Sequence, residues 1–126
     1  MTPIYQKLAQ LIAAAHRCRE SSNPEWFARH VDTAREIVSE HFPSGSGFDS
    51  GTELDVSRST GDKLVFTTAF HHTDEHGSYD GWTNHDVIVR ASLQHGFTVR
   101  VTGRDRNDIK DYIAEMFAES LDTEIN

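Results

Sequence analysis

The chain has 126 residues, a formal net charge of −8 and a sequence pI near 5.4. This length suits one domain with a single core, and the acidic balance argues against a protein that coats long nucleic acid. The single cysteine, Cys18, excludes an intramolecular disulfide and fits a reducing compartment. No signal peptide or membrane-spanning stretch is recognisable, so we expect a soluble intracellular protein.

Two helices are predicted in the first third of the chain. Thr2-Pro3 has the form of an N-cap followed by proline, and apolar residues then recur at helical spacing over about 3–20. The Ser-Ser-Asn-Pro segment ends this helix and repeats the cap signal. A second apolar face runs from Phe27 to Phe42, where Pro43 ends the helix. The pattern predicts an αα-hairpin over residues 1–43.

Residues 44–51 form a segment rich in glycine and serine. It lacks the flanking strand and the Gly-Lys-Ser/Thr ending that a phosphate-binding P-loop needs. We interpret it as a linker between a helical half and a sheet half, with a lid as the alternative.

Four strands are predicted over residues 52–102, because apolar and polar residues alternate there. The alternation is marked by Leu54 and Val56, by residues 64–70, by residues 87–91 and by residues 97–101. Short connections between the strands predict an antiparallel meander, and a helix is predicted over 107–121. The whole order predicts one α+β domain over 1–126, with an N-terminal helical hairpin, a four-stranded antiparallel sheet and a C-terminal helix packed on the sheet.

The turn between the last strand and the last helix is the first candidate site. Gly103 breaks the strand, and Arg104 and Arg106 then stand at the start of the helix, with Asp105 or Asn107 expected as its N-cap. Free backbone N–H groups and the positive end of the helix dipole favour an anion at this place. We therefore predict that Arg104, Arg106 and Asn107 bind a phosphate. The alternative is a solvated set of ion pairs with the neighbouring aspartates.

The second candidate site is the predicted loop over residues 71–85, which contains four histidines, three carboxylates and two aromatic residues. Tyr79 and Trp82 can present flat rings to a purine base, as aromatic side chains do in nucleotide sites. The alternative is a decorated hairpin with solvated histidines, and for Trp82 itself we expect core packing, because it begins a strand. The candidate ligand-binding residues of this loop are His71, Tyr79, Asp80, Trp82 and Asn84.

A metal site is a further hypothesis for the same loop, since imidazole nitrogens and carboxylate oxygens suit zinc. Its ligands would be His71, His72, His76 and His85, with Asp74 or Asp80. However, neighbouring histidines on a strand point to opposite faces. There is also no Gly-x-Ser-x-Gly motif, and Cys18 lies within a predicted helix. We therefore predict no catalytic residue, no metal ligand and no cofactor.

Two sequence blocks resemble a known family. They are Tyr79-Asp80-Gly81-Trp82-Thr83 and the run from Gly103 to Tyr112, within a similarity that covers roughly residues 42–117. Both resemble blocks in the first-described class of phage Thoeris anti-defence proteins. The resemblance implies a protein that binds cyclic ADP-ribose isomers made by bacterial TIR-domain proteins and sequesters them without cleavage, in the cytoplasm of the bacterial host.

The resemblance also implies the partners. The ligand would lie between the protomers of a homodimer, which can assemble further into a hexamer, and some members hold cyclic oligonucleotides at separate sites. No membrane and no long nucleic acid would be involved. Two other functions stay open from the residues: a metal- or His-dependent phosphodiesterase for a small nucleotide, and an inhibitor that binds a protein through its acidic surface.

Overall fold

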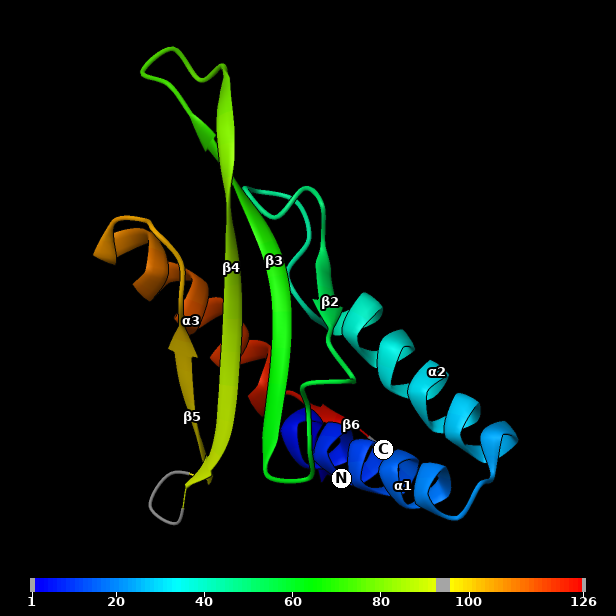
Figure 1. Cartoon of the computed structure of the whole chain (residues 1–126). Helices are drawn as coiled ribbons and strands as arrows, with labels where there is room; N and C mark the ends of the chain where they lie inside the picture. The colour runs from blue at the N-terminus through cyan, green and yellow to red at the C-terminus, as the bar shows by residue number, and fades with distance from the viewer. Residues whose placement is uncertain (1, 93–95, 126) are drawn as a thin grey trace.

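The computed structural model describes residues 2–92 and 96–125 (Figure 1). The predicted bounds at residues 1 and 126 and the connection at 93–95 lie outside the described residues. The elements in chain order are β1 (Thr2–Pro3), α1 (Ile4–Glu20), α2 (Pro24–His41), β2 (Thr52–Leu54), β3 (Lys63–Thr73), β4 (Tyr79–Ser92), β5 (Gly96–Val101), α3 (Asn107–Asp122) and β6 (Glu124–Ile125). The α+β class is confirmed.

The main sheet has four strands in the order β2-β3-β4-β5, and every neighbouring pair is antiparallel. This confirms the predicted meander. Side chains alternate between the two faces of a strand. On β3 and β4 the residues Leu64, Phe66, Val87 and Val89 are fully buried, and they define the inner face of the sheet. We name the opposite face the outer face.

The hairpin of β3 and β4 is longer than predicted. β3 continues to Thr73 and β4 begins at Tyr79, so the loop predicted over residues 71–85 is wrong. Asp74 closes a tight turn, since its Oδ1 accepts the backbone N–H groups of His76 and Ser78, each at 2.9 Å. Figure 1 shows this hairpin projecting beyond the other strands. We name its projecting part, residues 71–83, the arm.

The predicted cap of α1 is also wrong. Thr2 and Pro3 are extended and pair with Ile125 and Glu124, and Pro3 makes no side-chain cap hydrogen bond. The C-terminal segment takes the place of the cap, because the carbonyl of Thr123 accepts the first helical N–H, that of Ile4, at 2.8 Å. By contrast, the predicted cap signal before α2 is confirmed, because the side chain of Asn23 accepts the N–H of Trp26.

The segment over residues 44–51 joins the helical part to the sheet, but its centre belongs to the core. Phe48 is 1% exposed and packs edge-on against Phe70, with ring centroids 5.2 Å apart. The backbone carbonyl of Gly47 accepts the N–H of His71 at 2.8 Å, so the segment is fixed to β3. Gly47 has φ +102°, and a Cβ there would lie 2.7 Å from the ring of Phe70.

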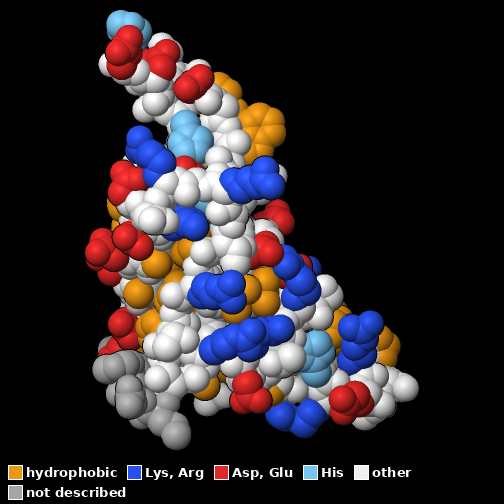
Figure 2. Space-filling view, turned by 60° about the vertical axis from the view of Figure 1, so that its left-hand side comes forward, with side chains coloured by type: hydrophobic (Ala, Val, Ile, Leu, Met, Phe, Trp, Pro, Cys, Tyr) orange, Lys and Arg blue, Asp and Glu red, His pale blue; other side chains and the backbone are white. Residues whose placement is uncertain are grey.

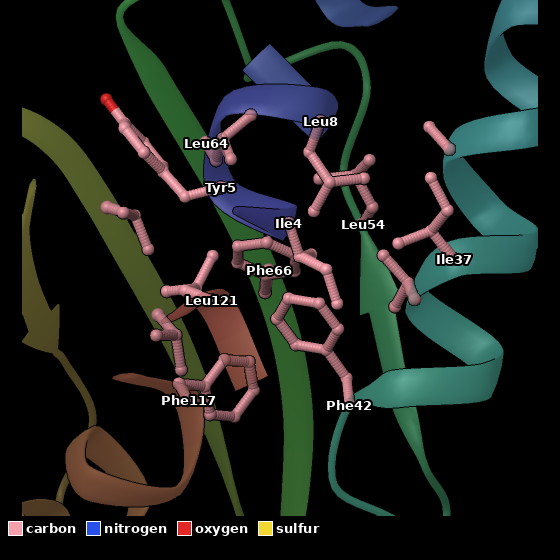
Figure 3. Packing of buried hydrophobic residues seen from close by; sticks show 14 of the residues in the cluster. Ile4, Tyr5, Leu8, Ile37, Phe42, Leu54, Leu64, Phe66, Phe117 and Leu121 are labelled. Atoms are coloured by element: carbon pink, nitrogen blue, oxygen red, sulfur yellow. The ribbon is translucent and has the colours of Figure 1, made fainter. Parts of the chain in front are cut away.

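The core lies between the inner face of the sheet and the helices, as Figure 3 shows. Phe66, at the centre of β3, stacks on Phe42 with centroids 4.8 Å apart and meets Phe117 of α3 edge-on at 5.6 Å. Phe117 therefore attaches the C-terminal helix to the sheet. Within the described residues, no helix is both long enough and apolar enough to cross a bilayer.

Phe117→Ala tests this attachment. Phe117 is fully buried, so the variant should lose about 3–5 kcal/mol of the free energy of unfolding through lost burial and a cavity. Urea denaturation measures the loss. Glu115→Ala, at an exposed position of the same helix, should change stability by less than about 0.5 kcal/mol. Equal losses in the two variants would contradict the packing described.

Candidate functional site

The aromatic residues of the arm are exposed. Tyr79 and Trp82 are each 59% exposed, so the expected core packing of Trp82 is wrong. The reason is strand alternation. His85, Val87 and Val89 are buried on the inner face, which places Trp82 and Asn84 on the outer face.

His71 joins the aromatic residues on this part of the arm. It is the register partner of Trp82, and its ring centroid lies 5.5 Å from that of Tyr79. Its Nε2 is 3.1 Å from the hydroxyl of Ser50. The structure thus brings His71, Tyr79 and Trp82 together, with Asp80 exposed on β4 between the two aromatic residues.

The turn between β5 and α3, residues 103–107, we name the arginine turn. Arg104, Arg106 and Asn107 are all exposed. Arg106 itself is the N-cap residue of α3 and makes no side-chain cap hydrogen bond, so the predicted cap by Asp105 or Asn107 is wrong. The Nε of Arg106 lies 3.3 Å from Oδ1 of Asp108, which is the solvated ion pair considered as the alternative.

Asp105 has another role, which the sequence analysis did not predict. Its Oδ2 lies 3.1 Å from Nε2 of His85 and 3.2 Å from Nε2 of His72, while its Oδ1 accepts the N–H of Arg106 at 2.8 Å. The side chain of Asp105 is 6% exposed and that of His85 is 0% exposed. We name His72, His85 and Asp105 the His-Asp cluster.

A signal for this cluster was present in the sequence. His72 continues the inward alternation of Phe66 and Phe70 on β3, and His85 continues that of Val87 on β4. The predicted loop over residues 71–85 hid this alternation, although a strand there would already place the neighbouring His71 and His72 on opposite faces.

The arginine turn is pressed against β4. Gly103 has φ +116°, and a Cβ there would lie 2.7 Å from the backbone oxygen of Asn84 and 2.6 Å from Nδ1 of His85. The N–H of Thr102 donates to the carbonyl of Asp86 at 2.9 Å. The turn therefore lies against the backbone of Asn84 and the inward-facing ring of His85, at the root of the arm, whereas the side chains of Trp82 and Asn84 point to the outer face.

A groove of about 330 Å³ lies on the sheet next to this place, and Asn84 is among its lining residues. Asp86 also lines the groove, and the guanidinium of Arg58 donates two hydrogen bonds, of 2.8 and 3.1 Å, to the carboxylate of Asp86. Figure 2 shows lysine and arginine side chains spread over this side of the molecule, while carboxylates and a histidine gather at the tip of the arm. Local charge thus differs from the net charge of −8.

Arg58 also contributes to the lowered pKa of the Asp55 carboxyl group. Hydrogen bonds from Ser57 and Arg58 lower the pKa of Asp55 from its ordinary 3.8 to about 2, and the guanidinium of Arg58 lowers the pKa of Asp86. The three residues form an ion network at the edge of the outer face.

The structure does not bring the candidate metal ligands together into one metal centre within the described residues. Across residues 2–92 and 96–125, no group of three or more His, Cys, Asp or Glu side chains is placed to hold a metal ion. His71 contacts Ser50, whereas His72 contacts Thr83 and Asp105, in keeping with the predicted opposite faces.

Comparisons with protein-family models, curated proteins and solved structures find no match to this chain. The resemblance to Thoeris anti-defence proteins therefore depends on the two sequence blocks alone.

Arg58→Gln tests the ion network through its pH dependence. A carboxyl group whose pKa is lower in the folded protein stabilises the fold above its unfolded value of 3.8, and that stabilisation is lost as the pH falls toward about 2. The free energy of unfolding should therefore fall less between about pH 5 and pH 2.5 in Arg58→Gln than in the unmodified protein. Arg90→Gln, also at an exposed arginine, should keep the full decrease. Identical decreases in all three proteins would contradict the network.

Proposed function

We propose that this chain binds a small nucleotide of the cyclic ADP-ribose class and sequesters it without cleavage. The proposal is supported by two exposed groups at the same end of β4: the rings of Tyr79 and Trp82 on the outer face of the arm, and the guanidiniums of the arginine turn, which contacts the backbone of Asn84. Such a ligand has a flat base and a pyrophosphate, and each group suits one of these parts.

The chemistry of the two groups supports this assignment. An aromatic ring stacks on a base with about 1–3 kcal/mol, and guanidiniums bind phosphate oxygens through charge-assisted hydrogen bonds. Arg106 must first leave Asp108. Because both side chains are more than 70% exposed, that pair contributes only about 0–1 kcal/mol, less than the roughly 1.5–3 kcal/mol of a charged hydrogen bond.

Self-association would complete the site. In a single chain a base stacked on Tyr79 or Trp82 would stay open to water on its far side, because both rings lie on an exposed part of the arm. A second protomer could cover it, in agreement with the homodimer, and the hexamer built from it, that the resemblance implies. The proposed setting is the cytoplasm of the bacterial host.

The His-Asp cluster gives little support to a His-dependent phosphodiesterase. The side chain of His85 is completely buried, and its two ring nitrogens already contact Thr102 and Asp105. Nε2 of His72 is likewise held by Thr83 and Asp105. These nitrogens would have to leave their partners before they could exchange protons with a ligand.

Recovery of the ligand separates the possible functions. The protein is incubated with a cyclic ADP-ribose isomer, freed of unbound ligand, denatured by heat and analysed by chromatography. Intact ligand is the expected result, whereas hydrolysed ligand would mean an enzyme. If no member of a nucleotide panel changes the melting temperature, the proposal fails and an inhibitor that binds proteins through the acidic arm tip becomes the better hypothesis.

Arg104→Ala and Arg106→Ala test the anion contacts. Each should weaken binding by about 1.5–3 kcal/mol, which is roughly tenfold to a hundredfold, because a charge-assisted contact is lost. Stability should change by less than about 0.5 kcal/mol, since both side chains are exposed. Isothermal titration calorimetry measures the affinity. Arg17→Ala, at an exposed position on α1, is the control and should bind as tightly as the unmodified protein.

Trp82→Ala tests the stacking contact. Affinity should fall by about 1–3 kcal/mol while the melting temperature stays nearly constant, because the ring is 59% exposed. Trp26→Ala is a matched control, since Trp26 is 49% exposed but lies on α2. Equal affinity in the Trp82 and Trp26 variants would remove the aromatic part of the site.

A further inference from the structure

The His-Asp cluster joins three parts of the chain that the sequence separates. His72 comes from β3, His85 from β4 and Asp105 from the arginine turn. It is closed to water at its centre, where the side chain of His85 is 0% exposed and that of Asp105 is 6% exposed. The charge state of such a group affects how firmly the turn is held to the arm.

The hydrogen bonds of His85 require a proton that a neutral imidazole does not have. Its Nδ1 lies 2.7 Å from the carbonyl oxygen of Thr102, which can only accept. Its Nε2 lies 3.1 Å from Oδ2 of Asp105. A neutral imidazole donates from one nitrogen only. The lone pair of its other nitrogen would then face an oxygen that is itself an acceptor. The pair of His85 and Asp105 must therefore share one additional proton.

The surroundings of Asp105 indicate where that proton resides. Its Oδ1 accepts the N–H of Arg106, and its Oδ2 faces the Nε2 atoms of both histidines. A carboxyl group that accepts a backbone N–H at one oxygen and faces two imidazole nitrogens at the other can accept from all of them only in its ionised form. The additional proton then belongs to the imidazole ring, which can donate to both of its partners.

We propose that His85 is an imidazolium ion, buried in an ion pair with Asp105, and that this pair clamps the arginine turn to the root of the arm. Around it, β3 contributes His72, whose Nε2 lies 3.2 Å from the same carboxylate oxygen and 3.0 Å from the hydroxyl of Thr83. From α3, Tyr112 packs its ring against Phe48 and Phe70, and the guanidinium of Arg106 lies near Asp108. This inference goes beyond ligand binding, because it concerns the free protein.

The clamp makes stability depend on pH in a definite direction. The folded chain keeps a proton on His85, whereas an unfolded histidine has lost most of its proton above about pH 6.5. Since the folded state then binds one proton more, the unfolding equilibrium constant should rise by up to tenfold for each unit of pH.

Nuclear magnetic resonance of the free, full-length protein tests the charge directly. With ¹⁵N-labelled histidine at about pH 7, both ring nitrogens of His85 should show the shifts of protonated nitrogens, with the resonance assigned through its loss in His85→Gln. A single neutral tautomer at His85 would overturn the proposal. No ligand is present, so the result is independent of whether the chain binds a nucleotide.

Asp105→Asn provides a second test. The amide of asparagine can donate to Nε2 of His85, so a neutral imidazole then satisfies both contacts and the additional proton is no longer needed. Between about pH 7 and pH 9, this variant should lose most of the rise in the unfolding equilibrium constant. His76→Gln, at the exposed tip of the arm, should keep it. A full rise in Asp105→Asn would overturn the proposal, and if that variant does not fold, the spectrum of the unmodified protein decides.

Discussion

The burial of Phe66 against Phe42 and Phe117 determines which way the side chains of β3 and β4 point, up to the register shift between His71 and Thr73. Side chains alternate along a strand, and a shift of one residue would exchange the two faces. With Phe66 fixed inward, His72 is directed toward the arginine turn, and through the pairing of β3 with β4 so is His85. The same constraint places Trp82 and Asn84 on the outer face. One aromatic contact in the core thus separates a buried polar cluster from an exposed aromatic surface.

The arginine turn shows how an acidic chain can present local positive charge. Asp105 is buried and used by backbone and histidine donors, so its charge is satisfied inside the protein. Arg104 and Arg106, on either side of it, remain exposed. The turn packs directly against the backbone of β4, because Gly103 has no side chain.

Much of the fold could be predicted from the sequence because its helices and core strands have clear periodicity. Asn23-Pro24 and the alternation around Phe66 are local signals, and both were interpreted correctly. The arm was missed because its residues are mostly polar on both faces, so alternation carries little hydrophobic contrast beyond Phe70. The extended Thr2-Pro3 pair and the contacts of Asp105 depend on partners far along the chain, which a local cap signal cannot represent. The contact of the arginine turn with the backbone of Asn84 follows only from the docking of the turn on β4.

Gly103 also has a meaning for the recognition of distant relatives. A side chain there would collide with a backbone oxygen, and its φ of +116° is one that other residues rarely adopt. Gly47, with φ +102°, meets a similar restriction against Phe70. Proteins that share this architecture should therefore keep glycine at both positions even where the rest of the sequence has diverged. Two glycines, one packed against Phe70 and the other against His85 and the backbone of β4, form a search pattern based on sterics rather than on overall similarity.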